Sequence, residues 1–260
     1  MAMTLTAAVP PAAAEIAAIQ VEYDLTEIIP NTDHLITEDD APVDNIFSEK
    51  QQRLLTEPLY TSWRGPGPGR PFLAAANVGI FYALHERPLA PDVFLSVDVQ
   101  ASPDWWEKRG RSYLVWEHGK PPDVVIEVVS NLKGEETGQK FQRYAWMRVP
   151  YYVIFDPQQL LQPTLLRLYE LRGGEYVERS EGWLTIVQLG LVLWQGSYEG
   201  MPDQWLRWCD AEGQVLLTGA EGMEQERQRA EQERQRAEQE HQRAERLLAQ
   251  LRALGVKPEA

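Results

Sequence analysis

The chain has 260 residues, of which 43% are hydrophobic and 25% are charged, and its formal net charge is −14. This composition is that of a globular protein with a substantial core, and it excludes a disordered chain, a collagen-like fibre and a small disulfide scaffold. The single cysteine, Cys209, excludes an intrachain disulfide and a cysteine-based zinc site. A lone cysteine is typical of a reducing compartment, and neither a membrane-spanning run nor a secretory signal is evident, so we expect a cytoplasmic protein.

The first 49 residues are strongly acidic. They contain ten Asp and Glu side chains and no Lys or Arg, and so they carry −10 of the net charge of −14. Because prolines interrupt residues 1–40 and apolar periodicity is weak there, we predict an acidic N-terminal arm. An acidic chain lacks the basic surface expected for nucleic-acid binding, which counts against such a partner.

A helix followed by strands is predicted next. Residues 44–63 have a helical spacing of apolar side chains, Pro58 limits their far end, and the sequence GPGPG at 65–69 interrupts the pattern. Three later segments have strand signals: 72–84, 93–99 and 112–117. Residues 93–99 show a period of two along the chain, which is the spacing of a strand with two different faces.

A strand–helix–strand unit occupies the centre of the chain. Residues 124–129 are almost wholly apolar, as in a strand that is covered on both faces. Residues 135–147 follow with a helical pattern, and residues 151–155 form a second buried strand. This order predicts a βαβ unit inside a mixed sheet.

Antiparallel strands are predicted after this unit. A β-hairpin is centred on Gly173 and Gly174, and residues 184–196 add more strand. We therefore predict an α/β (α+β) domain at 41–218, with a mixed central sheet, flanking helices and extra β-hairpins.

Residues 219–260 form a tail with a seven-residue repeat. The sequence EQERQRA occurs at 224–230 and again at 231–237, and related units follow twice more. Ala230 and its equivalents, with Arg227 and its equivalents three residues earlier, recur on one face of a predicted helix. Two interpretations stay open: an oligomerising left-handed coiled coil, or a single solvated helix that Glu–Arg pairs stabilise.

Two acidic side chains in the strand region are candidates for a metal site. Asp92 opens one predicted strand after Pro91, and Glu127 lies inside another strand that is otherwise valine and isoleucine. A buried carboxylate is costly unless it is paired or bound to a metal. Neighbouring strands lie about 4.8 Å apart, so two such carboxylates can share one Mg²⁺, with Mn²⁺ as an alternative. Asp123 fits less well, because four residues of strand separate it from Glu127 by about 13 Å.

A cation is expected beside these carboxylates, to orient the attacking water or to neutralise charge in the transition state. Lys140 is the first choice, because it lies on the helix that follows Glu127, with Tyr144 one turn further on the same face. Lys133, in the connecting loop, is the second choice. A divalent ion bound at such a set supports phosphoester hydrolysis.

These residues carry a resemblance to a known family. The sequence PPDVVIEVVS at 121–130, followed by GQKFQRY and RVPYYVIFDP, resembles the Uma-type family of restriction-endonuclease-like proteins, within the PD-(D/E)XK nuclease superfamily. The resemblance covers about residues 35–160, and the heptad-repeat tail is of a kind often appended to this family. It implies a restriction-endonuclease-like fold and divalent-metal-dependent hydrolysis of DNA phosphodiester bonds.

The resemblance also implies roles for individual residues. Asp92 matches the superfamily's metal-binding aspartate, and Glu127 matches the acidic residue of the (D/E)XK element. Val129 occupies the place of the motif's lysine, and Lys140 on the next helix stands in for that lysine.

A helical acid often completes such sites. The matching region here, APVDNIFSEKQQR, offers Asp44 and Glu49, of which Asp44 is the better positional match. The catalytic residues that we predict are therefore Asp92, Glu127, Lys140 and Asp44, with the first two as metal ligands.

Other functions stay open on the sequence alone. A non-catalytic, oligomeric interaction protein on a nuclease-derived scaffold is favoured by the acidic charge balance and by the repeat tail. A metal-dependent hydrolase of another phosphoester needs only the carboxylate pair. The segment WWEKRGR at 105–111 is the one local basic and aromatic patch, and it is a candidate contact with a nucleic-acid backbone. We predict DNA as the substrate and a homo-oligomer, a dimer or larger, with no membrane partner.

Overall fold

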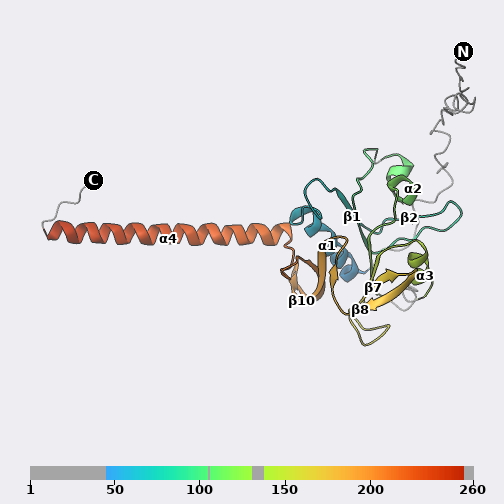
Figure 1. Cartoon of the computed structure of the whole chain (residues 1–260). Coiled ribbons are helices and arrows are strands. Elements are labelled where there is room, and N and C mark those ends of the chain that lie inside the picture. The colour runs from blue at the N-terminus through green and yellow to red at the C-terminus, as the bar shows by residue number, and fades with distance from the viewer. Residues whose placement is uncertain (1–44, 105, 131–137, 255–260) are drawn as a thin grey trace, which may run out of the picture. The chain divides into compact units, whose positions relative to one another are not determined.

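A computed structural model describes residues 45–104, 106–130 and 138–254 (Figure 1). All of these residues belong to one compact unit of the chain, residues 36–260. The predicted acidic arm at 1–40 lies outside the described residues. Among the described residues, no helix combines the length and the apolar character that crossing a membrane requires.

The described chain begins and ends with a helix, and all of its described strands lie between the two. In chain order the elements are α1 (Ile46–Thr61), β1 (Phe72–Ala76), β2 (Ile80–Phe81), β3 (Val93–Val97), the 3₁₀ turn η4 (Lys108–Gly110), β4 (Tyr113–Leu114), α2 (Val115–His118), β5 (Val124–Val128), α3 (Gln139–Trp146), β6 (Tyr151–Phe155), β7 (Leu166–Arg172), β8 (Glu175–Arg179), β9 (Trp183–Leu184), β10 (Leu189–Tyr198), β11 (Met201–Cys209) and α4 (Gly219–Ala253). The predicted first helix and the predicted strand–helix–strand unit are confirmed, with slightly shorter bounds.

Six strands form the central sheet, in the spatial order β1-β3-β5-β6-β7-β8. β5 and β6 run parallel, with α3 as the crossover between them, and the other neighbours in this sheet are antiparallel. The sheet is therefore mixed, as predicted. A second sheet contains β9, β10 and β11, and the short strands β2 and β4 pair with each other.

The two faces of the central sheet have different covers. Side chains of α1, such as Leu55, and of the three-stranded sheet pack on one face, whereas Tyr144 of α3 packs on the other. Because side chains alternate along a strand, Ile126 of β5 joins the first cluster and Val125 joins the second. Glu127 follows the same alternation and points to the α3 side, where its carboxylate meets two side chains of that helix.

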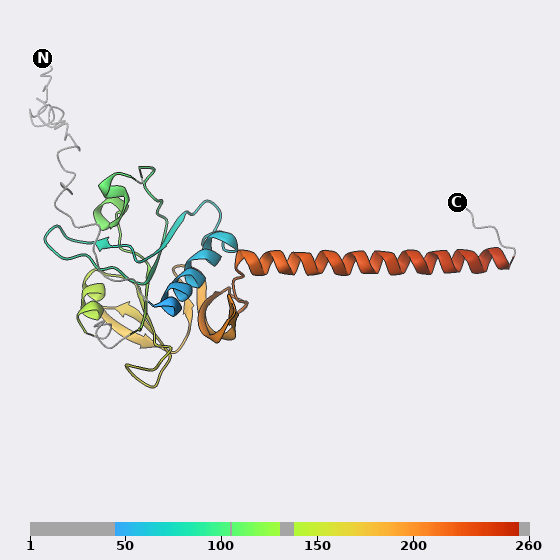
Figure 2. The same cartoon turned by 180° about the vertical axis from the view of Figure 1, so that it is seen from behind.

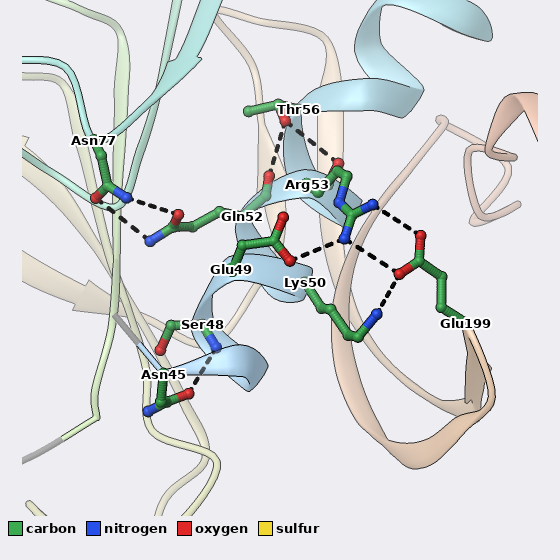
Figure 3. Close-up of polar contacts among 9 residues, drawn as sticks. All are labelled: Asn45, Ser48, Glu49, Lys50, Gln52, Arg53, Thr56, Asn77 and Glu199. Carbon is green, nitrogen blue, oxygen red and sulfur yellow. Dashed lines mark hydrogen bonds and ion pairs between the residues drawn. The ribbon is translucent and has the colours of Figure 1, made fainter. Parts of the chain in front are cut away.

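Helix α1 is fixed to the β10–β11 hairpin along one side (Figures 2 and 3). The Gln51 amide donates from Nε2 to the Leu206 carbonyl at 2.8 Å, and its Oε1 accepts the Leu206 N–H at 3.0 Å. At the hairpin turn, Lys50 and Arg53 both form ion pairs with Glu199. The buried amide contact holds the helix more firmly than these ion pairs, because exposed pairs contribute little.

Two predicted strands are shorter in the structure. The run at 72–84 is interrupted at Asn77, whose φ of +54° turns the chain, so that β1 and β2 are separate strands. Of the predicted strand at 112–117, only two residues pair, and the next four form the helical turn α2. Gly119 ends that turn in the left-handed region, with a φ of +73°.

The predicted hairpin at Gly173 and Gly174 is confirmed as β7 and β8, and both glycines have positive φ, which favours glycine at such a turn. The predicted strand at 184–196 is two strands instead of one. β9 ends at Leu184, the first residue of the predicted strand. β10 begins only after Gln188, whose φ of +56° reverses the chain.

Helix α4 is anchored to the domain at its first turn (Figure 1). The buried Arg207 donates from Nη1 and Nη2 to the two carboxylate oxygens of Glu221, at 2.8 and 2.6 Å. Thr218 and Glu221 also cap each other: the Thr218 N–H donates to Oε2, and the Glu221 N–H donates to Oγ1. The predicted helical tail is thus confirmed, and its described side chains are exposed from Met223 onward. The predicted domain boundaries stay predictions.

Candidate active site

Glu127 is the central residue of the candidate site. It lies near the end of β5, and only 1% of its surface is exposed. Two side chains of α3 donate hydrogen bonds to its carboxylate: Lys140 from Nζ to Oε2, and Tyr144 from its hydroxyl to Oε1, both at 2.9 Å. Because these residues are four apart on the helix, both point to the same strand. Lys140 keeps 27% of its side chain exposed, so one side of this cluster meets solvent.

Asp92 lies beside Glu127 at the same end of the sheet. It comes directly before β3, which pairs with β5 in antiparallel register. Its Oδ2 accepts the Val128 N–H at 2.6 Å, and its Oδ1 accepts Gln52 Nε2 at 2.9 Å. Because Val128 follows Glu127 directly, this backbone contact holds the two carboxylates near each other, and Asp92 is only partly buried.

The electrostatics of the cluster follow from this proximity. Burial raises the pKa of Glu127 to about 8, and the charge of Asp92 adds to that rise. Lys140 and the hydrogen bond from Tyr144 act in the opposite direction. Burial also raises the pKa of Tyr144 well above its ordinary value, so this phenol stays protonated and donates to Glu127.

Gln52 is the residue of this site that the sequence reasoning missed. It projects from α1 toward Asp92, and its amide also exchanges hydrogen bonds with Asn77 (Figure 3). Glu49, which the sequence offered as a helical acid, is exposed and pairs with Arg53 on the other side of the same helix. The signal available in the sequence was two consecutive amides, Gln51 and Gln52, within the predicted helix, and the structure buries both.

The remaining residues that the sequence offered as candidates are not seen at this site. Asp44 and Lys133 lie outside the described residues. Asp123 does not approach Glu127: its carboxylate accepts the Val97 N–H and pairs with Lys120 at the other end of β5. The patch at 105–111 exposes Trp106 by 87%.

Asp92 and Glu127 are the candidate metal donors among the described residues of this site. In the part of the chain that the structure describes, no group of three or more Asp, Glu, His or Cys side chains is placed to hold a metal ion. Asp92 and Glu127 are nevertheless held side by side, and the negative charge of one disfavours ionisation of the other. A carboxylate oxygen that accepts one hydrogen bond keeps a second lone pair for a ligand. The pair therefore fits a divalent ion that takes its other ligands from water.

A mixed central sheet with flanking helices is the architecture of a restriction-endonuclease-like protein. Residues 36–196 match the model of the Uma2 family, whose description is "Putative restriction endonuclease", and the chain belongs to this family. The fold and the family that the sequence predicted are thus confirmed. A comparison with curated proteins finds no match.

Proposed function

We propose that this chain is a divalent-metal-dependent endonuclease that hydrolyses phosphodiester bonds in DNA. The observation that supports it is the adjacent pair Asp92 and Glu127, with Lys140 hydrogen-bonded to the second carboxylate. Family membership supports the nuclease class in general. The choice of DNA over RNA, and the need for a metal, belong to the proposal.

Asp92 and Glu127 are the residues that would hold the ion, Mg²⁺ or Mn²⁺. A bound divalent ion lowers the pKa of a water molecule and neutralises charge that builds up on a phosphate. Side chains of the protein orient these two carboxylates and supply the positive charge beside them. Tyr144 fixes the orientation of Glu127, Gln52 fixes that of Asp92, and Lys140 places a positive charge at the solvent-facing side of the cluster.

Metal binding at this site depends on the protonation state of Glu127. A carboxylate must lose its proton to bind a divalent ion, and burial holds the pKa of Glu127 near 8. Lys140 favours the ionised form, because its ammonium donates directly to Oε2. In the reaction the same ammonium can turn toward the phosphate, where it neutralises charge in the transition state.

The test is plasmid cleavage in Mg²⁺ and in Mn²⁺ by the full-length protein, by Glu127→Gln and by Lys140→Met. Glu127→Gln is expected to abolish cleavage and Lys140→Met to slow it by about 10²–10³-fold. Glu212→Gln, an exposed change of the same type in a surface turn, is the matched control and is expected to cleave normally. Equal cleavage by Glu127→Gln in a preparation free of contaminating nuclease would contradict the proposal.

A second function has one observation in its favour. Both carboxylates already have hydrogen-bond partners, and no third acidic ligand joins them among the described residues. A non-catalytic interaction protein on a nuclease-derived scaffold would have this arrangement. Calorimetric titration of Mn²⁺ separates the two: binding that Glu127→Gln removes supports the nuclease, whereas a folded protein that binds no ion supports the interaction protein.

A further inference from the structure

The last turns of α4 expose a cluster of leucines on a helix that is otherwise polar. Their exposed fractions are 51% for Leu247, 38% for Leu248, 37% for Leu251 and 77% for Leu254. Contiguous apolar surface of this kind on a polar element usually marks a contact with a partner. The leucine cluster lies far along the helix from the anchor at Glu221, and no described residue of the domain covers it.

The leucine cluster continues the face set by the seven-residue repeat. Counting back in sevens from Leu251 reaches three alanines, the first of them Ala244, and counting back from Leu248 reaches His241 and then two arginines. Leu248 and Leu251 therefore occupy the two positions that form the seam of a coiled coil. The first three repeats place small or charged side chains in that seam, and only the last places leucine at both positions.

We propose that α4 pairs in parallel, and in register, with α4 of a second copy of this chain. A second copy is the partner that fits, because the same stripe on two identical helices brings leucine against leucine. The parallel direction follows from the uneven seam. In an antiparallel pair the leucine cluster of one helix would face the alanine and arginine layers of the other, and the leucines would stay exposed.

The charges beside the seam agree with the parallel direction. Arg227 and Arg234 lie in the stripe, and Glu226 and Glu233 border it. In a parallel, in-register pair Arg227 and Arg234 each face their own counterparts, and the glutamate at the preceding position of the other helix lies beside each of them and offsets that repulsion. Within one helix these arginines pair with Glu224 and Glu231, but such exposed pairs are weak and exchange readily.

The small area of contact predicts a weak dimer, so the fraction of dimer should depend on protein concentration. The helix has 35 residues, which is about 52 Å of possible contact. Stable interfaces bury about 1,200 Å² or more, and a few leucines fall short of this alone, so the polar repeats must add contact area. We expect a dissociation constant in the micromolar range, with monomer at low concentration.

Sedimentation equilibrium of the full-length chain over a range of concentrations tests the pairing. Leu248→Glu/Leu251→Glu is expected to raise the dissociation constant by at least about tenfold. Ala249→Glu/Gln250→Glu adds the same charges to the same turn on the opposite face, and is expected to dimerise like the wild type. A monomer at every concentration, or an equal effect of the two double variants, would overturn the proposal. Circular dichroism checks that α4 stays helical in both.

Cysteine cross-linking tests the direction. Ala230→Cys and Ala244→Cys place a thiol in the seam near each end of the repeat, and the natural Cys209 is buried. In a parallel pair each variant is expected to form a disulfide-linked dimer with itself, because equivalent seam positions face each other. Cross-linking only in a mixture of the two variants would show an antiparallel pair and would overturn this arrangement.

Discussion

The side-chain amide of Gln52 donates to Oδ1 of Asp92 at 2.9 Å, and this contact connects helix α1 to the carboxylate pair. The neighbouring residue, Gln51, ties the same helix to the backbone of β11 through two hydrogen bonds. Two consecutive amides thus serve different purposes: one fixes the helix, and the other uses the fixed helix to orient a carboxylate. We therefore regard Gln52 as a positioning residue for Asp92.

Replacement of Gln52 by alanine is expected to lower the free energy of unfolding by about 1 kcal/mol, because its hydrogen bonds to the partly buried Asp92 and to the exposed Asn77 are lost. Gln52→Glu is the informative companion. It sets a third carboxylate beside Asp92, so it should destabilise the ion-free protein by charge repulsion and strengthen Mn²⁺ binding.

Urea unfolding with and without Mn²⁺, together with calorimetric titration, measures both effects of the Gln52 variants. A purely structural role for Gln52 predicts that both variants lose stability and that neither gains metal affinity. That result would contradict the assignment of Gln52 to the site. Thr56→Ala, one turn further along α1, is the control, because its hydroxyl bonds only to carbonyls of its own helix among the contacts described.

The stability of the protein is expected to fall as pH rises from about 4.5 to about 8. Burial, with the charge of Asp92, raises the pKa of Glu127 to about 8, whereas an unfolded chain keeps it near 4.3. Between these values the folded protein binds more protons than the unfolded chain, so raising the pH favours unfolding. The whole effect is at most about 5 kcal/mol.

The amide of Glu127→Gln does not titrate, so the difference in unfolding free energy between wild type and variant isolates the contribution of Glu127 protonation. We expect the variant to gain relative stability steadily between pH 5 and pH 8, the range that the two pKa values define. Urea denaturation at unit steps of pH measures it. Parallel stability curves for the two proteins would show that Glu127 is ionised throughout, in both the folded and the unfolded state.

Lys140→Met should shift the pH dependence of the site upward. Its ammonium favours ionised Glu127, so its loss raises the pKa of that carboxyl further and weakens Mn²⁺ binding at neutral pH. Lys140→Arg keeps the charge and should restore most of the affinity. Calorimetric titration of Mn²⁺ at several pH values measures this, and an unchanged pH profile in Lys140→Met would contradict it.

Much of the arrangement around Glu127 was predictable from the sequence, because the chemistry there is local. A lone acid in a run of valine and isoleucine must have partners, and the helix that follows such a strand packs back against it, so Lys140 and Tyr144 were within reach. The parallel pairing of β5 and β6 follows from the helical crossover between them, because only a long connection brings the chain back to start a parallel strand. Alternation along β5 then decides which face Glu127 occupies.

The contact between Gln52 and Asp92 could not be predicted in this way. The two residues are 40 positions apart, and their meeting depends on how α1 lies across the sheet, which no local pattern specifies. The interruption at Asn77 has a similar cause. An apolar run such as 72–84 reads as one strand, but the turn at Asn77 is stabilised by a side-chain contact with Gln52 on a distant element.

The anchor of α4 allows a last test, on the pair Arg207 and Glu221. Glu221→Ala leaves the buried guanidinium of Arg207 without its bidentate partner, and should lower the free energy of unfolding by about 2–3 kcal/mol. Arg207→Leu/Glu221→Leu removes both charges and should cost less than Glu221→Ala alone, because no buried charge is left uncompensated. Glu224→Ala removes an exposed carboxylate one turn further along α4, and should leave the free energy of unfolding unchanged. Urea denaturation of the three variants measures these differences, and equal losses in Glu221→Ala and Glu224→Ala would show that the first turn of α4 is not held by Arg207.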